Sequence, residues 1–272
     1  MNDIILKLQD MRYLKWTKSR NSSGTAGSFL KSYDDTGSVK LYYKLSDYDS
    51  LNGIVGHECI NEIIAQRVLS ILGIEHLEYR LIHALIRIDD KDIETYLCES
   101  YDFKMPGETK LPLEDFYQMQ RKNGESPMDF CIRNNMHKFI YEMLIIDFLI
   151  INRDRHGANI EILFDRKNRT FRPAPLFDHG LSFVFRCRTT KEVTDFDAMG
   201  DVRVQSFVGG SSTFQNLNMV PKSYIKQLGK LQESDRDRIF EGIENIIGPV
   251  YCNKIWEILM RRWSYLEDIR NS

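Results

Sequence analysis

The charged sequence RDRH (153–156) interrupts the most apolar part of the chain, between FIYEMLIIDFLII (139–151) and IEILF (160–164). Asp154 in this sequence is followed five residues later by Asn159, and the downstream sequence PLFDHG contains Asp178. Phosphoryl transfer from a nucleotide uses one carboxylate at the acceptor hydroxyl and an Asn and an Asp that hold divalent cations. An Asp and an Asn at this spacing are common, so the flanking elements must decide whether these residues meet.

Lys44 is a candidate for the basic residue that this chemistry needs at the nucleotide phosphates, and it lies in KLYYKLS (40–46), a predicted strand. The helix predicted to follow Gly56 carries Glu58 and Glu62 four residues apart on one face. A carboxylate on that helix can hold the lysine ammonium in place, and we expect Glu62 to be the partner. The alternatives are a solvated strand lysine and two surface acids.

A small-residue loop, SRNSSGTAGS (19–28), precedes this strand. Within it, Ser22, Ser23, Gly24 and Thr25 can offer backbone N–H groups and hydroxyls to phosphate oxygens, as small-residue turns do. Loops of Ser and Gly are usually simple connections, so the composition of the loop does not by itself assign a phosphate site.

A purine site is predicted where the strand ETYLCESYDF (94–103) joins the two halves of the chain. The backbone groups of Glu99, Ser100 and Tyr101 are the candidates for pairing with the edge of the base. A strand that simply connects two lobes would have the same sequence character.

The sequence FDHG (177–180) is expected to be a turn in which Gly180 allows the backbone to aim Asp178 at a magnesium ion. An ordinary Asp/Gly turn is the alternative. His156 is expected to be a structural hydrogen-bonding residue, because no second His or Cys lies at a metal-ligand spacing from it.

Hydrophobic periodicity and turn residues divide the chain into a strand-rich first part and a helix-rich second part. One helix is expected over about 56–73, and one long helix is expected from about Pro127 or Asn135 to Ile151. The stretch 188–220, which is polar and carries Gly and Ser, is expected to be mobile. Hairpins are predicted for 79–89 with 93–100 and for 160–165 with 170–178, the second with a proline-bearing edge strand.

The composition describes a soluble globular protein of one large domain or two lobes: 272 residues, 42% hydrophobic, 28% charged, and a net charge of −2. This charge gives no general attraction to nucleic acid or to acidic membranes. Five scattered cysteines suggest reduced thiols. No signal peptide and no stretch of about 18 apolar residues is present, so a cytoplasmic location is expected, with secretion by another route left open.

The residues NRDRHGAN followed by PLFDHG resemble the HipA-like protein kinase family, and in particular its short members. The family's motif residues fall here on Asp154, His156, Asn159, Asp178 and Gly180. Its upstream Asn-Glu helix, which ends in Leu-Gly, is similar to the segment 61–73. The resemblance spans about residues 20–185.

This resemblance implies an α+β, bilobal protein-kinase-like fold. It implies a small, mainly β N-lobe with one long helix (1–100) and a larger, mainly helical C-lobe (101–272). It also implies ATP and Mg²⁺ as cofactors, Asp154 as the catalytic base, and Asn159 and Asp178 as metal ligands.

Members of the family commonly phosphorylate a serine of their own phosphate loop, which here would be Ser22, Ser23 or Ser28. The resemblance further implies a protein substrate with a Ser or Thr acceptor. A helix-turn-helix antitoxin is an open expectation as a partner, because the longer members carry an additional N-terminal subdomain that this sequence lacks.

Two other functions fit the same residues. Phosphoinositide-type lipid kinases also use an Asp-Arg-His-x-x-Asn loop and an Asp-x-Gly, although this chain has no accessory lipid-binding domain. A pseudokinase scaffold would bind ATP without transferring phosphate.

Overall fold

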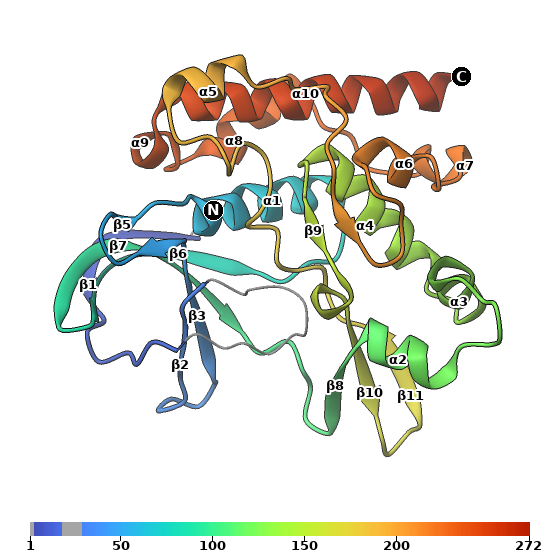
Figure 1. The fold of residues 1–272 in the computed structure, drawn as a ribbon, viewed down its shortest axis with the longest axis horizontal. Coiled ribbons are helices and arrows are strands. Elements are labelled where there is room, and N and C mark those ends of the chain that lie inside the picture. The colour runs from blue at the N-terminus through green and yellow to red at the C-terminus, as the bar shows by residue number, and fades with distance from the viewer. Residues whose placement is uncertain (1–2, 18–28) are drawn as a thin grey trace.

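The computed structural model describes residues 3–17 and 29–272. Figure 1 shows two parts: a sheet built from the first hundred residues, and a helical part that runs to the C-terminus. Helix α1 lies between them. The α+β fold class, with a mainly β N-terminal part and a helical C-terminal part, is therefore confirmed.

The main sheet has five strands in the order β1-β6-β7-β3-β2. Strands β1 and β6 are parallel, whereas the other neighbours are antiparallel. The elements of this part are β1 (Ile4–Asp10), β2 (Lys31–Asp34), β3 (Leu41–Leu45), β4 (Tyr48–Asp49), β5 (Gly53–Ile54), α1 (Glu58–Leu72), β6 (Tyr79–Ile88) and β7 (Lys91–Tyr101).

The predicted hairpin of β6 and β7 is confirmed, and Ile88 pairs with Lys91 across a two-residue turn. Both turn residues, Asp89 and Asp90, have positive φ values of 48° and 61°. Two residues of positive φ are typical of the turn that matches the right-handed twist of a hairpin, and Asp tolerates this conformation. The short-range turn signal therefore located this hairpin correctly.

Helix α1 is buried almost all round, because the sheet covers one side and the C-terminal helices cover the other. It ends at Gly73, whose φ of 71° is the left-handed conformation that terminates a helix without a Cβ clash. Its buried Arg67 donates hydrogen bonds of 2.8 Å to the carbonyl oxygens of Ile239 and Glu241. The helix is thus attached to both parts of the molecule.

The second part contains α2 (Leu113–Gln120), α3 (Pro127–Arg133), α4 (His137–Leu149), α5 (Thr190–Asp195), α6 (Thr213–Leu217), α7 (Lys222–Ile225), α8 (Arg236–Phe240), α9 (Glu244–Ile247) and α10 (Pro249–Asn271), with the 3-10 turns η1 (Gly157–Asn159) and η2 (Glu233–Asp235). Of the two starts expected for the helix that ends near Ile151, Pro127 is wrong, whereas Asn135 is close to the observed start of α4 at His137. Two helices, α3 and α4, flank a break at Asn135, whose φ of 57° is incompatible with a continuous helix.

A three-stranded sheet in the order β11-β10-β8 lies below helices α2 and α3 in the view of Figure 1. Its strands are β8 (Glu108–Pro112), β10 (Glu161–Asp165) and β11 (Thr170–Pro173), so the predicted hairpin with a proline-bearing edge strand is confirmed. Strand β8 was not predicted, because ETKLP is short and polar and has no alternating pattern.

Two short strands, β9 (Asp154–Arg155) and β12 (Gln205–Ser206), pair in parallel. No helix or strand was predicted over 188–220, yet that stretch contains α5, β12 and α6. The pairing of β9 with β12 brings residues 205–206 beside the sequence RDRH. Within the described residues, no helix combines the length and the apolar character that a membrane crossing needs.

The packing of the helical part can be tested by substituting Arg262. This side chain is completely buried and donates to the carbonyl oxygens of Ala198 (2.8 Å), Phe148 (3.0 Å) and Gly200 (2.7 Å), and burial lowers its pKa to about 10. Arg262→Met removes the donor from all three carbonyl oxygens, so we expect the free energy of unfolding in urea to fall by about 3 kcal/mol.

The neighbouring Arg261 is the control for this variant, because its side chain is 55% exposed. Arg261→Met should change the free energy of unfolding by less than about 0.5 kcal/mol. Equal effects of the two substitutions would contradict a structural role for Arg262.

Candidate functional site

The Lys44 ammonium lies between two carboxylates that come from distant parts of the chain. It is 3.2 Å from Oε1 of Glu62 in α1 and forms a closer ion pair with Oδ1 of Asp178. Burial disfavours the ammonium, but the carboxylates of Asp178 and Glu62 outweigh burial and raise the pKa of Lys44 well above its usual value. The predicted pairing of Lys44 with Glu62 is present, and the alternative of a solvated strand lysine is excluded.

Helix α1 also holds the loop that contains Asp178. Oε2 of Glu62 accepts a hydrogen bond of 2.8 Å from the backbone N–H of His179. The side-chain amide of Asn61 donates to the carbonyl oxygens of Gly180 (2.8 Å) and Ser182 (3.2 Å). Two adjacent helix residues therefore fix the loop, and Glu62 connects that loop to Lys44.

The residue with the unusual backbone in FDHG is Asp178 and not Gly180. Asp178 has a φ of 62°, a left-handed conformation that is uncommon for a residue with a Cβ. Gly180 is needed for a different reason: a Cβ there would lie 3.0 Å from Cβ and 3.3 Å from the carbonyl oxygen of Glu58. The prediction that Gly180 allows the turn is corrected, because this glycine allows the close approach of α1.

The apolar segment is interrupted at RDRH because Arg155 forms a buried ion pair there. The Arg155 guanidinium binds both carboxylate oxygens of Asp147 in α4, at 2.9 and 2.8 Å, and both side chains are nearly inaccessible. It also donates to the carbonyl oxygens of Phe177 (2.8 Å) and Asn159 (3.3 Å). Arg155 therefore joins α4, the RDRH loop and the Asp178 loop. The sequence identified Asp147 only as an interruption of an apolar helix.

Asp154 and Asn159 are held together within that loop. The Asn159 amide donates a hydrogen bond of 2.9 Å to the carbonyl oxygen of Asp154, which leaves Oδ1 of Asn159 as its acceptor atom. Burial raises the pKa of Asp154, and the nearby Asp178 carboxylate raises it further. Oδ1 of Asp154 is buried without a hydrogen-bond partner in the described part of the chain. This loop therefore presents an unsatisfied carboxylate oxygen close to Asp178.

His156 has the structural role that was expected. Its Nδ1 accepts a hydrogen bond of 3.2 Å from the backbone N–H of Ala158 and so caps the turn η1. Its Nε2 lies 3.7 Å from Oδ1 of Asp154, which makes it a positive neighbour of that carboxylate when protonated.

The donor set suits magnesium better than zinc. Asn159 and Asp178 offer oxygen ligands, and Mg²⁺ bound with nucleotide phosphates takes one or two such protein ligands. No group of three or more His, Cys, Asp or Glu that could hold a metal by itself occurs within residues 3–17 and 29–272. The residues present therefore fit a cation that is carried with phosphates.

Among solved structures, one match is the proinflammatory kinase CtkA of Helicobacter pylori, with a TM-score of 0.62 and 15% sequence identity over 96% of each chain. The chain has the fold of this kinase. The resemblance to the HipA-like kinases that the motifs predicted is thereby confirmed at the level of the fold.

A second match is HipA of Shewanella oneidensis, in a structure with HipB and operator DNA. It has a TM-score of 0.41 and 14% identity over 94% of this chain and 68% of HipA. No protein-family model matches the sequence, and no curated protein matches it. The fold and the geometry of the site therefore carry the functional interpretation.

The predicted purine site lies at the end of β7 in this kinase-like fold. Glu99 and Ser100 have ladder partners on both sides, in β3 and in β6, whereas Tyr101 pairs only with Leu41 of β3. The side of Tyr101 that faces away from β3 is therefore where the sheet leaves backbone groups without a strand partner. Of the three predicted residues, Tyr101 is the best placed to meet a base through its backbone.

Charged side chains that sequence reasoning missed lie beside this strand end. The Lys110 ammonium is 3.0 Å from Asp102 and 3.9 Å from the centre of the Phe103 ring, and that ring is 5.6 Å from the ring of Phe177. Burial raises the pKa of Glu161, the residue that follows η1 and Ile160 on β10. These residues lie in separate segments of the chain and follow no motif spacing, so the sequence alone did not link them.

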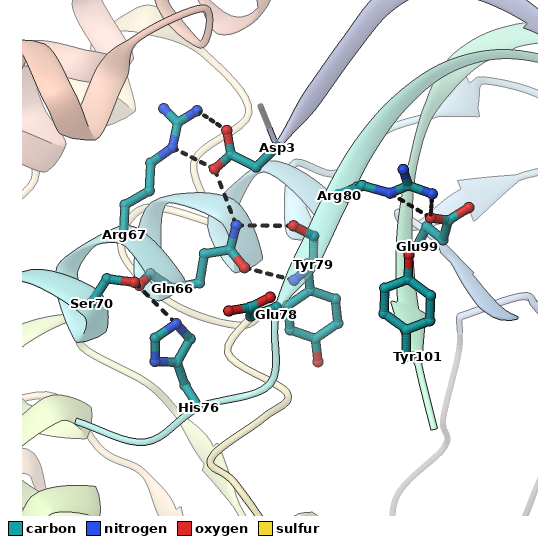
Figure 2. A pocket seen from close by; sticks show the side chains of 10 residues that line it. All are labelled: Asp3, Gln66, Arg67, Ser70, His76, Glu78, Tyr79, Arg80, Glu99 and Tyr101. Carbon is teal, nitrogen blue, oxygen red and sulfur yellow. Dashed lines mark hydrogen bonds and ion pairs between the residues drawn. The ribbon is translucent and has the colours of Figure 1, made fainter. Parts of the chain in front are cut away.

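A cavity of about 360 Å³ lies next to α1, on the side that Figure 2 shows. Its polar lining is largely paired: Arg67 donates to Asp3 at 2.7 Å, and Arg80 forms an ion pair with Glu99. Glu99 and Tyr101, two of the three residues of the predicted purine site, also line this cavity, whereas Lys44, Glu62 and Asp178 do not. The cavity therefore adjoins the predicted purine residues and not the charged groups around Lys44.

The predicted phosphate loop residues Ser22, Ser23, Gly24, Thr25 and Ser28 lie outside the described residues. The flanking segments are described, and Thr17 pairs with Lys31 in an antiparallel bridge. The described residues Thr17 and Lys31 on either side of the loop therefore pair at the start of β2.

Removing the charge of Lys44 should change how the free energy of unfolding depends on pH, and this change tests the charge cluster. The ammonium lowers the pKa of both Asp178 and Glu62 despite their burial. Their stabilising contribution is therefore present above the unfolded-state pKa, about 4, and is lost as the pH falls through the lower folded-state values. Lys44→Met leaves the buried Glu62 carboxylate and the part-buried Asp178 carboxylate without the cation between them, and repulsion raises both pKa values.

We expect Lys44→Met to lower the free energy of unfolding by about 3 kcal/mol near pH 7. The loss should be smaller near pH 5, because the folded variant then binds protons that the unfolded chain does not. Urea titrations at both pH values measure this. Lys91→Met, at an exposed position of the same sheet, should show no such difference; a loss for Lys44→Met that grows on acidification would exclude the proposed charge cluster.

Proposed function

We propose that this chain is an ATP-dependent serine/threonine protein kinase of the HipA-like type. The observation that carries the proposal is the position of Lys44, held by Glu62 of α1 and by Asp178 of the loop that follows β11. A lysine paired with a helix glutamate beside a metal-binding aspartate is the arrangement that protein kinases use at the phosphates of ATP. The fold shared with CtkA supports the same activity.

Each polar group then has a role in phosphoryl transfer. Lys44 would bind the α- and β-phosphates, and Asn159 and Asp178 would hold Mg²⁺, which would supply positive charge at the phosphates. Asp154 orients the acceptor hydroxyl and accepts its proton. Its unsatisfied Oδ1 supports this role, because an acceptor hydroxyl is a donor that would satisfy it.

Glu62 and Arg155 are positioning residues in this proposal. Glu62 fixes both Lys44 and the backbone of His179. Arg155 binds the carbonyl oxygens on either side of the site, those of Asn159 and Phe177. Both therefore act through the groups that touch ATP, since placement of these groups is most of what a kinase supplies.

The acceptor is proposed to be a Ser or Thr of a protein, and the phosphate loop itself is the first candidate. Ser22, Ser23 and Ser28 lie between Thr17 and Lys31, which meet beside β2. A phosphate there would carry about two negative charges and would repel the phosphates of ATP. Autophosphorylation of the loop would therefore inhibit the enzyme.

The activity is tested by Asp154→Asn and Asp178→Asn in a radioactive transfer assay with Mg-ATP. The acceptors are the enzyme itself, a generic Ser/Thr protein substrate and phosphoinositide vesicles. We expect Asp154→Asn to lower transfer by about 10²- to 10⁴-fold with ATP binding retained, and Asp178→Asn to weaken Mg-ATP binding as well. Asp35→Asn, an exposed acid on the N-terminal part, should behave as wild type.

Three results would contradict the proposal. Wild-type rates in both variants would show that the site is misassigned. Label in lipid alone would indicate a lipid kinase. ATP binding by calorimetry without any transfer would indicate a pseudokinase.

Autophosphorylation is tested separately by mass spectrometry after incubation with Mg-ATP. We expect phosphate on Ser22, Ser23 or Ser28 in the wild type and none in Asp154→Asn, together with a falling transfer rate as the modification accumulates. An unmodified 19–28 peptide after many turnovers would exclude self-inhibition through this loop.

A further inference from the structure

Glu161 is a carboxylate whose position the motifs do not explain. It lies on β10 two residues after Asn159, and its backbone is fixed because its residue pairs with Pro112 and its carbonyl accepts a hydrogen bond of 2.8 Å from Ala174. The side chain therefore cannot leave this region without breaking the β8-β10-β11 sheet.

The Oε2 atom of Glu161 is buried and has no hydrogen-bond partner among residues 3–17 and 29–272. A buried carboxylate oxygen without a donor is costly, and such groups are rare in folded proteins. Lys110, the cation that acts most strongly on Glu161, is already paired with Asp102 at 3.0 Å. Glu161 is thus an acceptor that the chain itself leaves unsatisfied.

Glu161 lies between two ends of the site. On one side, Asn159 of the proposed metal and phosphate site precedes it by two residues. On the other side, its partner strand β8 carries Lys110, whose ammonium pairs with Asp102 just beyond the end of β7, where the base is proposed to bind. The part of a nucleotide between its base and its phosphates is the ribose.

We propose that the Glu161 carboxylate accepts hydrogen bonds from the ribose hydroxyls of the bound nucleotide and so selects ribonucleotides over deoxyribonucleotides. This inference rests on the proposed function, because it assumes that ATP binds at Lys44. An ionised carboxylate is an acceptor only, so its ligand must be a donor. The acids Asp102 and Asp178 near Glu161 disfavour an anion at this position, whereas neutral hydroxyls satisfy it.

The test compares Mg²⁺-dependent binding of ATP, 2′-deoxy-ATP and 3′-deoxy-ATP by calorimetry. We expect at least one deoxy analogue to bind the wild type about tenfold to a hundredfold more weakly than ATP, the usual range for a hydrogen bond to a charged group. In Glu161→Ala this preference should disappear through weaker ATP binding, with Glu161→Gln intermediate. Glu94→Gln, at an exposed glutamate, is the matched control and should keep the wild-type preference.

Thermal unfolding of the same variants separates recognition from structure. Glu161→Gln should not lower the midpoint, because it removes a buried charge that lacks a donor. A marked fall would mean that Glu161 stabilises the fold through contacts of its own, and the inference would be wrong.

The inference fails if Glu161→Ala keeps the wild-type ribose preference, or if the wild type has none. A variant that instead loses a preference for ATP over GTP would assign Glu161 to the base and would also overturn it. Wild type that binds ATP without ribose discrimination refutes this inference alone, whereas wild type that binds no nucleotide refutes the proposed function.

Discussion

The structure depends on one charge cluster, in which the part-buried Lys44 ammonium is shared by the buried carboxylate of Glu62 and the part-buried carboxylate of Asp178. The cation favours the ionised form of both carboxylates, and the carboxylates favour the charged form of the lysine. The cluster joins the main sheet, helix α1 and the loop after β11. The same ionic groups that hold these three elements together are the ones that phosphoryl transfer requires. The same ion pairs therefore hold the site in place and join the two parts of the fold.

In the helical part, a second ion pair, the buried Arg155 with Asp147, joins α4 to the loops that carry Asp154 and Asp178. Arginine suits this position because its planar group binds a carboxylate on one edge and carbonyl oxygens on the others. The last two turns of helix α4 (143–149) are buried on all sides. Asp147 is the one buried acid of this helix, and it anchors the loop that carries Asp154. Asn61 completes the arrangement by holding the carbonyl oxygens of the Asp178 loop.

The groups of the site fall into two classes that differ in how well the fold satisfies them. Lys44, Glu62 and Arg155 have several partners each and are rigidly placed. By contrast, Oδ1 of Asp154 and Oε2 of Glu161 are buried without hydrogen-bond donors in the part of the chain that the structure describes. Unsatisfied acceptors reduce stability, and they persist where a ligand supplies the missing donor. The positive φ of Asp178 is a further strained feature at the same place.

The sequence alone determined what depends on local physics. Periodicity located α1, and turn chemistry located the β6-β7 and β10-β11 hairpins. The motifs around Asp154, Asn159 and Asp178 gave the resemblance to the HipA-like kinases, and that resemblance implied the fold. Tertiary structure decided what depends on distant partners. Lys44 meets Asp178 across 134 residues, Gly180 is required by the approach of Glu58, and neither Arg155 nor Glu161 has a local pattern that distinguishes it from a surface charge. Local rules specify backbone conformation within a few residues, whereas the partner of a buried charge is set by which elements pack together.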